Sequence, residues 1–394
     1  MKKILLIDDG GLPLPSVDGG AVETLANMYL EMNEELERFE FDVYSSHSKT
    51  LKKYENKFKF SHYFYINDKN IVFKFKKYIK AFLRIVFNMD INPEFVNEVI
   101  KKTKKNNYDF ILIENAPNLV HACYKRFGDK IILHMHNNYL NNSVRNCKRT
   151  LKECKKIYTV SDFIKRQIDT IEENDKTKVL FNGVDLKKFN IETGKEKRNI
   201  YRKKYNILKE SIVFLFSGRV CDDKGVKELI LAFNNACKQC NDIKLLVVGS
   251  SFSSVKKKDK YIKDLIKISN LNKNNIIFTG YIDYDEMPNI YGMADVLILP
   301  SKIDDACPMT ILEAMAMGLP IIASKCGGIP EEVGKENSIL LDRKNLTENI
   351  ESAMKELLEN KKLIKDMSIE SFKRSQKFCK EEYLNNFFKE MSNL

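Results

Sequence analysis

The stretch that decides the fold is Ala294–Glu332, ADVLILPSKIDDACPMTILEAMAMGLPIIASKCGGIPEE. A short continuous apolar run at Val296–Leu299 predicts a strand buried on both faces, and Ile321–Ala323 predicts a second one. A helix is expected between these two strands, and Gly318 and Pro320 end it. A strand, a helix and a strand in this order form the unit of a parallel sheet. Ligands bind such sheets at the carboxyl ends of the strands.

The acidic residues of this stretch are the first candidates for a ligand site. Asp304 and Asp305 lie in the loop after the first strand, and the helix N-terminus that follows favours an anion. Glu313 lies eight residues after Asp305, within an apolar run. A carboxylate among apolar neighbours needs a partner, because it would otherwise become neutral. A pair of ligand hydroxyls and a nearby Lys or Arg are the two alternatives for that partner.

These residues resemble the donor-sugar signature of the retaining nucleotide-sugar glycosyltransferases of family 4 (glycosyl transferases group 1), which have the GT-B fold. Asp305 and Glu313 match the two acidic positions of the signature, and Ala314–Pro320 matches its tail. The family usually has glutamate at the position of Asp305 and a bulky aromatic residue at that of Cys307. These two departures bear more on the identity of the sugar than on the reaction class.

The resemblance implies an α/β architecture in which two Rossmann-like, doubly wound domains face a central cleft. The N-terminal domain is expected at residues 1–190 on the acceptor side, and the nucleotide-sugar donor domain at 191–374. Residues 375–394 would form a helix that crosses back to the N-terminal domain; a helix that packs only on its own domain is the alternative. The polar, lysine-rich segment 185–209 is expected to be a linker. A length of 394 residues agrees with two domains.

A glycine-rich loop near the N-terminus is a second candidate for ligand contact. A buried-type strand at Lys3–Ile7 precedes the loop, and helical spacing of apolar residues follows it at Ala21–Met32. This layout brings backbone N–H groups close to a phosphate, although a flexible connection would look the same. The family has a paired glycine here, near the donor diphosphate or the acceptor, and Gly19-Gly20 matches it.

Two histidines follow the buried-type strand Lys130–Leu133. On a continuing strand His134 and His136 share a face, which would suit a metal, but no third ligand is evident in the sequence. The family has a histidine at the position of His136, close to the reacting sugar and the acceptor, and needs no metal. We expect that role for His136, with a structural histidine as the alternative. We expect neither a metal nor a cofactor besides the nucleotide-sugar substrate.

A cationic pair follows the expected strand Ile212–Phe216. Arg219 and Lys224 lie five residues apart in a glycine-bearing loop, where they can clamp two phosphates. Ion pairing with Asp222 or Asp223 is the alternative. In the family, an arginine and a lysine at these positions grip the donor diphosphate.

The resemblance also implies the remaining donor contacts. The nucleotide base would lie at Tyr281-Ile282, the ribose at Glu313, and the sugar hydroxyls at Asp305 and the backbone beside it. The expected catalytic residues are His136, Arg219, Lys224 and Asp305. The expected donor-binding residues are Gly19, Gly20, Arg219, Lys224, Tyr281, Ile282, Asp305, Ala306, Cys307, Pro308, Met309, Thr310 and Glu313.

The charge balance favours anionic partners. Lys and Arg number 66 against 54 Asp and Glu, which gives a net charge of +12. No zinc-finger spacing or RNA-recognition signature is present, so we expect no nucleic acid. The stretch Lys69–Met89 has six basic residues, no acidic one, and apolar residues at helical spacing. Such a helix suits an anionic bilayer surface; a core-facing helix with a solvated charged face is the alternative.

Cysteine usage and hydropathy indicate the cellular compartment in which the protein is expected. Nine scattered cysteines, an odd number, are typical of reduced thiols in the cytoplasm. No window reaches the roughly 18 uncharged apolar residues of a membrane span, and the apolar run Ile4–Ile7 is too short for a secretion signal. We expect a cytoplasmic protein, with peripheral attachment to the inner face of the cell membrane through residues 69–89.

The expected function is metal-independent transfer of a hexose from a nucleotide sugar, a UDP-sugar, with retention at the anomeric carbon. The acceptor would be a glycan or a lipid-linked molecule in cell-surface polysaccharide or glycoconjugate synthesis. One alternative is a glycosyltransferase-like subunit that binds nucleotide sugars weakly and stabilises a partner. The departures from the family signature at Asp305 and Cys307 are the reason to consider it. The other is a GT-B-type sugar epimerase or phosphorylase.

Overall fold

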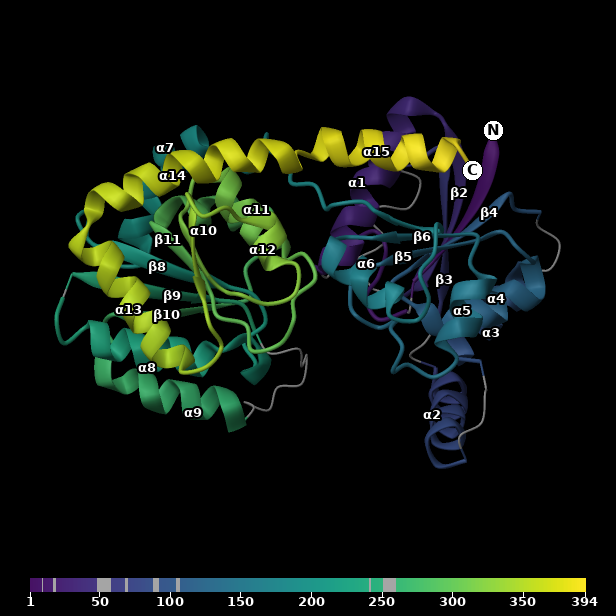
Figure 1. Cartoon of the computed structure of the whole chain (residues 1–394), viewed down its shortest axis with the longest axis horizontal. Coiled ribbons are helices and arrows are strands. Elements are labelled where there is room, and N and C mark those ends of the chain that lie inside the picture. Colours follow the sequence, from purple (N-terminus) through teal and green to yellow (C-terminus); the bar gives the residue numbers. More distant parts are fainter. Residues whose placement is uncertain are drawn as a thin grey trace. The chain divides into compact units, whose positions relative to one another are not determined.

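The computed structural model describes residues 1–8, 10–16, 19–47, 58–67, 70–87, 92–103, 107–240, 242–250 and 260–394. The chain divides into two compact units, each built on one parallel sheet with helices on its faces (Figure 1). Unit 1 comprises Met1–Phe181 and Tyr383–Leu394, and unit 2 comprises Asn182–Glu382. Unit 2 therefore begins at Asn182, before the boundary expected at residue 190, and ends at Glu382, after the boundary expected at residue 374.

Unit 1 contains a seven-stranded parallel sheet in the order β3-β2-β1-β4-β5-β6-β7. Its strands are β1 (Lys2–Ile7), β2 (Phe39–Ser46), β3 (Ser61–Ile66), β4 (Phe110–Glu114), β5 (Ile131–Met135), β6 (Lys156–Thr159) and β7 (Thr177–Val179). Its helices are α1 (Ala21–Leu36), α2 (Ile71–Val86), α3 (Glu94–Lys102), α4 (Val120–Phe127), α5 (Cys147–Glu153), α6 (Asp162–Asp169) and most of α15 (Lys380–Ser392). Strands β4 and β5 are buried at every residue, as expected for strands covered on both faces.

Helix α15 contributes to the core of unit 1 through aromatic side chains. Phe387 stacks on Tyr29 of α1 with ring centroids 4.3 Å apart, and Phe388 stacks on Phe39 of β2 at 6.1 Å. Phe387 and Phe388 are 0% and 1% exposed. Burial of one such side chain contributes roughly 1.5–3 kcal/mol. The last residues of the chain therefore stabilise the unit that the first residues form.

Unit 2 contains a six-stranded parallel sheet in the order β10-β9-β8-β11-β12-β13. Its strands are β8 (Ile212–Ser217), β9 (Ile243–Val248), β10 (Ile276–Gly280), β11 (Val296–Leu299), β12 (Ile321–Ser324) and β13 (Ser338–Leu341). Its helices are α7 (Ile191–Lys204), α8 (Val226–Ala236), α9 (Lys260–Ser269), α10 (Met287–Met293), α11 (Met309–Ala316), α12 (Ile329–Glu332), α13 (Leu346–Glu359) and α14 (Lys361–Ser375). The strands expected at 296–299 and 321–323 are confirmed.

The strand order of each sheet reverses beside its first strand. Strands β2 and β4 flank β1 in unit 1, and β9 and β11 flank β8 in unit 2. Since all the pairings are parallel, the loops after β1 and β4, and those after β8 and β11, leave their sheets at the carboxyl edge. Doubly wound folds bind ligands at such a switch point. The predicted site residues follow β1, β5, β8, β10 and β11.

The expectation of a linker at 185–209 was wrong, because residues 191–204 form helix α7. The helix is held by buried charge. Arg202 is 2% exposed, and its guanidinium donates to the Met293 carbonyl at 2.9 Å and to the Asp295 carboxylate at 2.7 Å. Arg198, one turn earlier, also binds Asp295. An apolar face, the usual sequence signal of a packed helix, is absent from the residues described for α7.

Candidate functional site

An ion pair joins two loops at the carboxyl edge of the unit 2 sheet. Lys224 ends a short turn after β8, Asp305 lies in the loop after β11, and Lys224 Nζ binds Asp305 Oδ1. The Ser301 hydroxyl donates to the other oxygen of the same carboxylate. The Lys224 and Asp305 side chains are 14% and 13% exposed. Lys224 thus pairs with Asp305, and not with Asp222 or Asp223, the alternative considered from the sequence.

Two glycines allow these loops to come close to each other. Gly225 has a φ of +66°, and a Cβ there would lie 2.1 Å from the Pro300 carbonyl oxygen. Gly327 has a φ of +57°, and a Cβ there would lie 2.0 Å from the Asp305 carbonyl oxygen. Any larger residue at either position would push the backbone of the Asp305 loop or its strand away.

Arg219, Tyr281 and Ile282 lie at the same edge of the sheet. Arg219 follows β8 and is exposed, while Tyr281 and Ile282 follow β10 and are exposed and half-buried. The ends of their strands are connected, since the Gly249 amide after β9 donates to the Gly280 carbonyl at 2.9 Å. The second predicted cation and the predicted base position are therefore accessible to a ligand from solvent.

Helix α11 begins beside the ion pair. Pro308 is the N-cap, and the helix starts at Met309. Ala306 and Cys307 before it are buried, and Thr310 is half-buried. The first N–H groups of any α-helix have no carbonyl partner within the helix. The loop after β11 thus ends in backbone donors suited to an anion.

Glu313 lies one turn into α11 and is buried. Its Oε2 accepts a hydrogen bond from the Tyr291 hydroxyl at 2.8 Å. Burial raises the pKa of the Glu313 carboxyl to about 7, against the effect of the Tyr291 hydrogen bond. The hydrogen-bond partner of this carboxyl is thus the Tyr291 hydroxyl, and the charge of Lys188 also favours the ionised form. Contact with ligand hydroxyls, the other alternative, stays a prediction.

A buried carboxyl that was not predicted from the sequence, Glu332, contacts the loop that contains Asp305. The Cys307 thiol donates to Glu332 Oε1 at 2.9 Å, and the Asn182 amide donates to the Cys307 carbonyl at 3.1 Å. Glu332 is 1% exposed, and its Oε2 has no hydrogen-bond partner among the described residues. Burial, with the nearby negative Asp305, raises the pKa of Glu332 well above its usual range. The available signal was an acidic residue between the apolar Ile329 and Val333.

Unit 1 holds a separate polar cluster at the ends of β4 and β5. The Glu114 carboxylate accepts from the Tyr29 hydroxyl at 2.9 Å and lies 2.8 Å from His136 Nε2 and 3.1 Å from His134 Nδ1. All four side chains are buried. The ligand atoms of Glu114 and the two histidines lie within 4.8 Å of one another, a donor set that could hold a divalent metal. Glu114 is thus the third candidate ligand that the sequence did not reveal.

The charges of this cluster favour a neutral His136. Burial, together with His134, lowers the pKa of His136 to about 4 in spite of the Glu114 carboxylate. Burial opposes ionisation of Glu114, but both histidines outweigh it and hold the pKa of that carboxyl well below its usual range. A neutral His136 that donates from Nε2 to Glu114 keeps Nδ1 as an acceptor for a hydroxyl.

The paired glycines begin helix α1 at the end of the loop after β1. Gly19 and Gly20 have φ angles of +80° and +107°, and Gly20 is the N-cap of the helix. A Cβ on Gly20 would lie 2.0 Å from the Glu23 carboxylate. Residues 9, 17 and 18 of this loop lie outside the described residues. The predicted glycines therefore have the backbone conformation that only glycine adopts readily.

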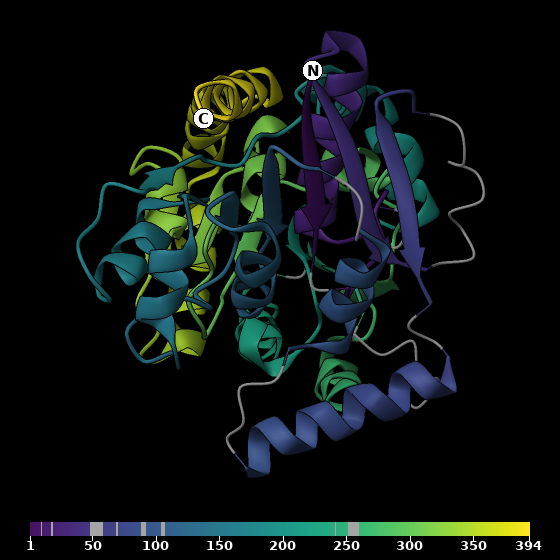
Figure 2. The same ribbon diagram turned by 90° about the vertical axis from the view of Figure 1, so that its right-hand side faces the viewer.

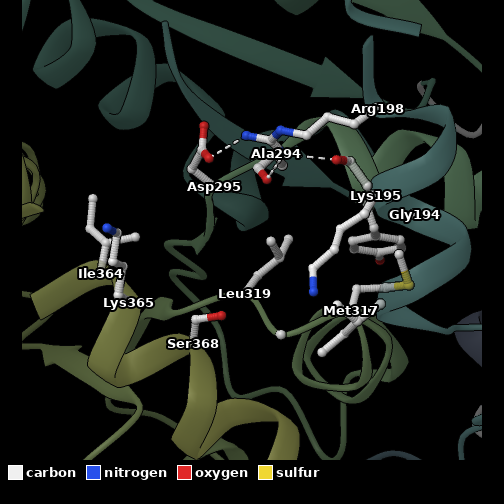
Figure 3. A pocket seen from close by; sticks show the side chains of 14 residues that line it. Gly194, Lys195, Arg198, Ala294, Asp295, Met317, Leu319, Ile364, Lys365 and Ser368 are labelled. Carbon is white, nitrogen blue, oxygen red and sulfur yellow. Dashed lines mark hydrogen bonds and ion pairs between the residues drawn. The ribbon is translucent and has the colours of Figure 1, made fainter. Parts of the chain in front are cut away.

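A pocket of about 290 Å³ lies at the opposite, amino edge of the unit 2 sheet. The lining residues Ala294 and Asp295 precede β11, and Leu319 precedes β12. Figure 3 shows Lys195 extending into the pocket and Arg198 bound to Asp295 at its rim. None of the predicted site residues lines this pocket. The donor site is therefore expected at the carboxyl edge and not here.

Comparison with known proteins identifies the relatives of this chain. Residues 197–374 match the family model described as Glycosyl transferases group 1. Spore coat protein SA of Bacillus subtilis is 29% identical over 354 residues, which are 87% of this chain and 86% of that protein. The lipopolysaccharide 1,2-N-acetylglucosaminetransferase of Salmonella typhimurium is 32% identical over 226 residues, 57% of this chain and 56% of that protein.

A solved structure shares the whole architecture. The crystal structure of Anabaena Alr3699/HepE in complex with UDP and glucose has a TM-score of 0.76 to this chain, at 18% identity and with 100% of both chains covered. The predicted pair of Rossmann-like domains is therefore confirmed. Residues 197–374 form a glycosyl transferases group 1 domain, in a chain of two parallel-sheet α/β domains that matches GT-B glycosyltransferase structures.

Proposed function

We propose that this protein is a retaining glycosyltransferase of family 4 that uses a UDP-sugar. It transfers a hexose to a glycan or lipid-linked acceptor in the synthesis of a cell-surface polysaccharide or glycoconjugate. The names of two comparison proteins support the donor and the pathway: the HepE structure contains UDP and glucose, and the Salmonella relative is a lipopolysaccharide N-acetylglucosaminetransferase.

The single observation that carries the proposal is the meeting of Lys224 and Asp305 at the switch point of the unit 2 sheet. A cation suits the leaving diphosphate, and a carboxylate suits the hydroxyls of the sugar attached to it. Both groups lie within the segment that matches the glycosyl transferases group 1 model. One ion pair thus brings together the two kinds of group that a nucleotide-sugar site requires.

The proposed mechanism places charge stabilisation at the diphosphate. As the bond between the sugar and the phosphate breaks, negative charge gathers on the leaving UDP. Arg219, Lys224 and the first N–H groups of α11 stabilise that charge, and such preorganised groups act strongly where water is excluded. We propose that these groups suffice without a metal ion.

Recognition of the donor uses the acidic residues and the backbone beside them. Glu313 accepts hydrogen bonds from the ribose hydroxyls, and the backbone at Tyr281-Ile282 holds the base. Asp305 and the backbone of Ala306–Pro308 hold the sugar hydroxyls. When a donor binds, Lys224 exchanges Asp305 for a phosphate, and Asp305 exchanges Lys224 for hydroxyls. Each side chain then has a partner in both states.

Unit 1 contributes His136 to the proposed reaction. Its neutral imidazole, oriented by the Glu114 carboxylate at 2.8 Å, contacts the transferred sugar or orients the acceptor hydroxyl. Glu114 touches no substrate in this scheme and is a positioning residue. Gly19 and Gly20 offer backbone donors near the diphosphate or the acceptor.

The test is turnover of purified protein with a panel of UDP-sugars, before and after removal of each cation. Arg219→Ala and Lys224→Ala should each lower kcat on the order of 10²-fold, as loss of one stabilising donor does in other transition states. Lys273→Ala is a matched control, since this exposed lysine precedes β10 at the amino edge of the sheet.

Near-normal turnover in both variants would contradict the mechanism. Transfer by the purified chain alone would dismiss the alternative of an inactive stabilising subunit. Release of UDP only when an acceptor is present would exclude an epimerase or a phosphorylase.

A further inference from the structure

Helix α2 exposes a continuous apolar face. Figure 2 shows α2 set apart from the sheet of its own unit. Seven apolar side chains fall within an arc of roughly 120° around the helix axis, and each is between 42% and 83% exposed. This apolar arc comprises Ile71, Val72, Phe75, Tyr78, Ile79, Phe82 and Val86. Monomeric soluble proteins rarely expose so many contiguous large apolar side chains.

The side of α2 opposite the arc attaches the helix to its unit. Phe73 is buried, and the amino groups of Lys76 and Lys80 both bind the carboxylate of Glu94, a buried residue in α3. The Asn70 side chain caps the helix by accepting from the Val72 amide at 2.9 Å. Phe73 and the Lys76 and Lys80 amino groups thus face the protein, and the apolar arc faces solvent. This is the reverse of the core-facing helix that the sequence left open as an alternative.

The composition of the helix identifies the chemistry of the missing partner. No Asp or Glu occurs in residues 70–87, and Lys74 is exposed beside the arc. Aromatic and aliphatic side chains with lysines and no acidic residue suit the interface of an anionic bilayer. No helix within the described ranges has both the length and the apolar character needed to cross a membrane. The helix would therefore lie in the plane of the bilayer surface.

We propose that α2 docks this protein on an anionic lipid bilayer by inserting the apolar arc below the headgroups. The apolar side chains supply most of the affinity, since Lys76 and Lys80 already pair with Glu94. Lys74, beside the arc, favours negative lipids. This deepens the proposed function, because a docked enzyme meets a lipid-linked acceptor at the surface that holds it. Residues 69, 88 and 89 of the basic stretch lie outside the described residues.

Insertion can be observed directly, because the sequence contains no tryptophan. Phe82→Trp places a single reporter on the arc. Phe372→Trp is a matched reporter on α14, where Phe372 is 42% exposed. Vesicles of phosphatidylcholine with phosphatidylglycerol should shift the emission of Phe82→Trp to shorter wavelength, and brominated lipids should quench it. The Phe372→Trp emission should not change. Absence of any shift or quenching in Phe82→Trp would overturn the proposal.

Vesicle sedimentation then measures the affinity. Phe75→Gln combined with Phe82→Gln should lower the partition coefficient by on the order of tenfold for each ring removed. Glutamine retains helix propensity, so a circular dichroism spectrum should stay unchanged. Ile369→Gln combined with Phe372→Gln, on the exposed side of α14, is the matched control and should bind like the unaltered chain. Equal binding of the arc variant and the unaltered chain would contradict the proposal.

Two further measurements separate this proposal from others. Turnover with a water-soluble acceptor should be unchanged in the arc variant, so that a failure of docking is distinguishable from a failure of the proposed function. Sedimentation velocity tests the second copy of the chain as an occupant. An unaltered dimer that the arc variant converts to a monomer, without vesicle binding by either, would assign the arc to self-association and overturn membrane docking.

Discussion

Lys224 and Asp305 lie 81 residues apart in the chain and form an ion pair between neighbouring strand ends of unit 2. Both side chains are largely shielded from water. Removal of the lysine leaves an aspartate whose carboxylate keeps the Ser301 hydroxyl as its hydrogen-bond partner among the described side chains. Breaking a buried pair on one side costs about 3 kcal/mol or more, because the remaining charge is uncompensated. The pair is therefore important for stability as well as for the proposed reaction.

Lys224→Ala should for this reason lower both turnover and the free energy of unfolding. Arg219→Ala should lower turnover alike but change stability by only about 0.5 kcal/mol or less, because Arg219 is exposed. Urea denaturation of the two variants beside the unaltered chain measures the difference. Equal stability losses in the two variants would show that the Lys224–Asp305 pair contributes nothing beyond surface charge.

Asp305→Glu should change the choice of donor sugar. The longer side chain carries the carboxylate about one bond length further from the backbone, and family members usually have glutamate here. We expect binding to Lys224 to persist and the ranking of kcat/KM across UDP-sugars to change. A single methylene typically alters discrimination by roughly 10–200-fold. An unchanged ranking would mean that Asp305 does not contact the sugar.

Glu313→Gln should abolish one pH dependence of stability. Burial raises the pKa of Glu313 to about 7 in the folded protein from an ordinary value of 4.5. Between these values the folded state holds a proton that the unfolded state has lost, so stability falls as pH rises and levels off above about pH 7. The loss is on the order of 3 kcal/mol. Thermal unfolding at about pH 5 and about pH 8 should show a smaller difference for Glu313→Gln than for the unaltered chain.

UDP binding should have the opposite pH dependence. Ribose hydroxyls donate to an ionised carboxylate, so affinity should rise with pH through about 7. Calorimetric titration measures this. Equal UDP affinity of Glu313→Gln and the unaltered chain at high pH would remove Glu313 from the ribose site.

Variants of Glu332 test whether the buried acid positions the Asp305 loop. Glu332→Gln keeps a neutral acceptor for the Cys307 thiol and should behave like the unaltered chain. Glu332→Leu removes that acceptor, and with it the oxygen Oε2 that lacks a partner among the described residues. It should raise KM for the donor several-fold while leaving the melting temperature unchanged or higher, since unpaired buried polar groups cost about 1–3 kcal/mol. Similar KM values for the leucine variant and the unaltered chain would refute this role.

The cluster in unit 1 makes the absence of a metal testable. Treatment with EDTA should leave turnover unchanged if hydrogen bonds alone organise Glu114, His134 and His136. Glu114→Gln should lower kcat about 10-fold or more, because the amide cannot orient His136 as an anion does. A metal would be assigned to this cluster instead if EDTA abolished activity and a divalent ion restored it. In that case EDTA should have no further effect on Glu114→Gln.

Part of the fold could be predicted because its signals are local. Val296–Leu299 and Ile212–Phe216 are apolar throughout, as is typical of strands covered on both faces. The strand β3 at the edge of its sheet was missed, because only its first and last residues are buried and no apolar run marks it. Helix α7 was missed because a buried guanidinium, and not an apolar face, attaches it.

The sequence by itself determined which residue types are present at the strand ends, and only the tertiary structure decided which of them meet. The order of strands brings Lys224 to Asp305, Cys307 to Glu332 and Glu114 to the two histidines, and local pattern does not encode that order. The same limit applies to α2. Helical spacing specifies that its apolar residues share one face, but whether that face meets the core or solvent depends on the packing of the opposite side, here set by Glu94.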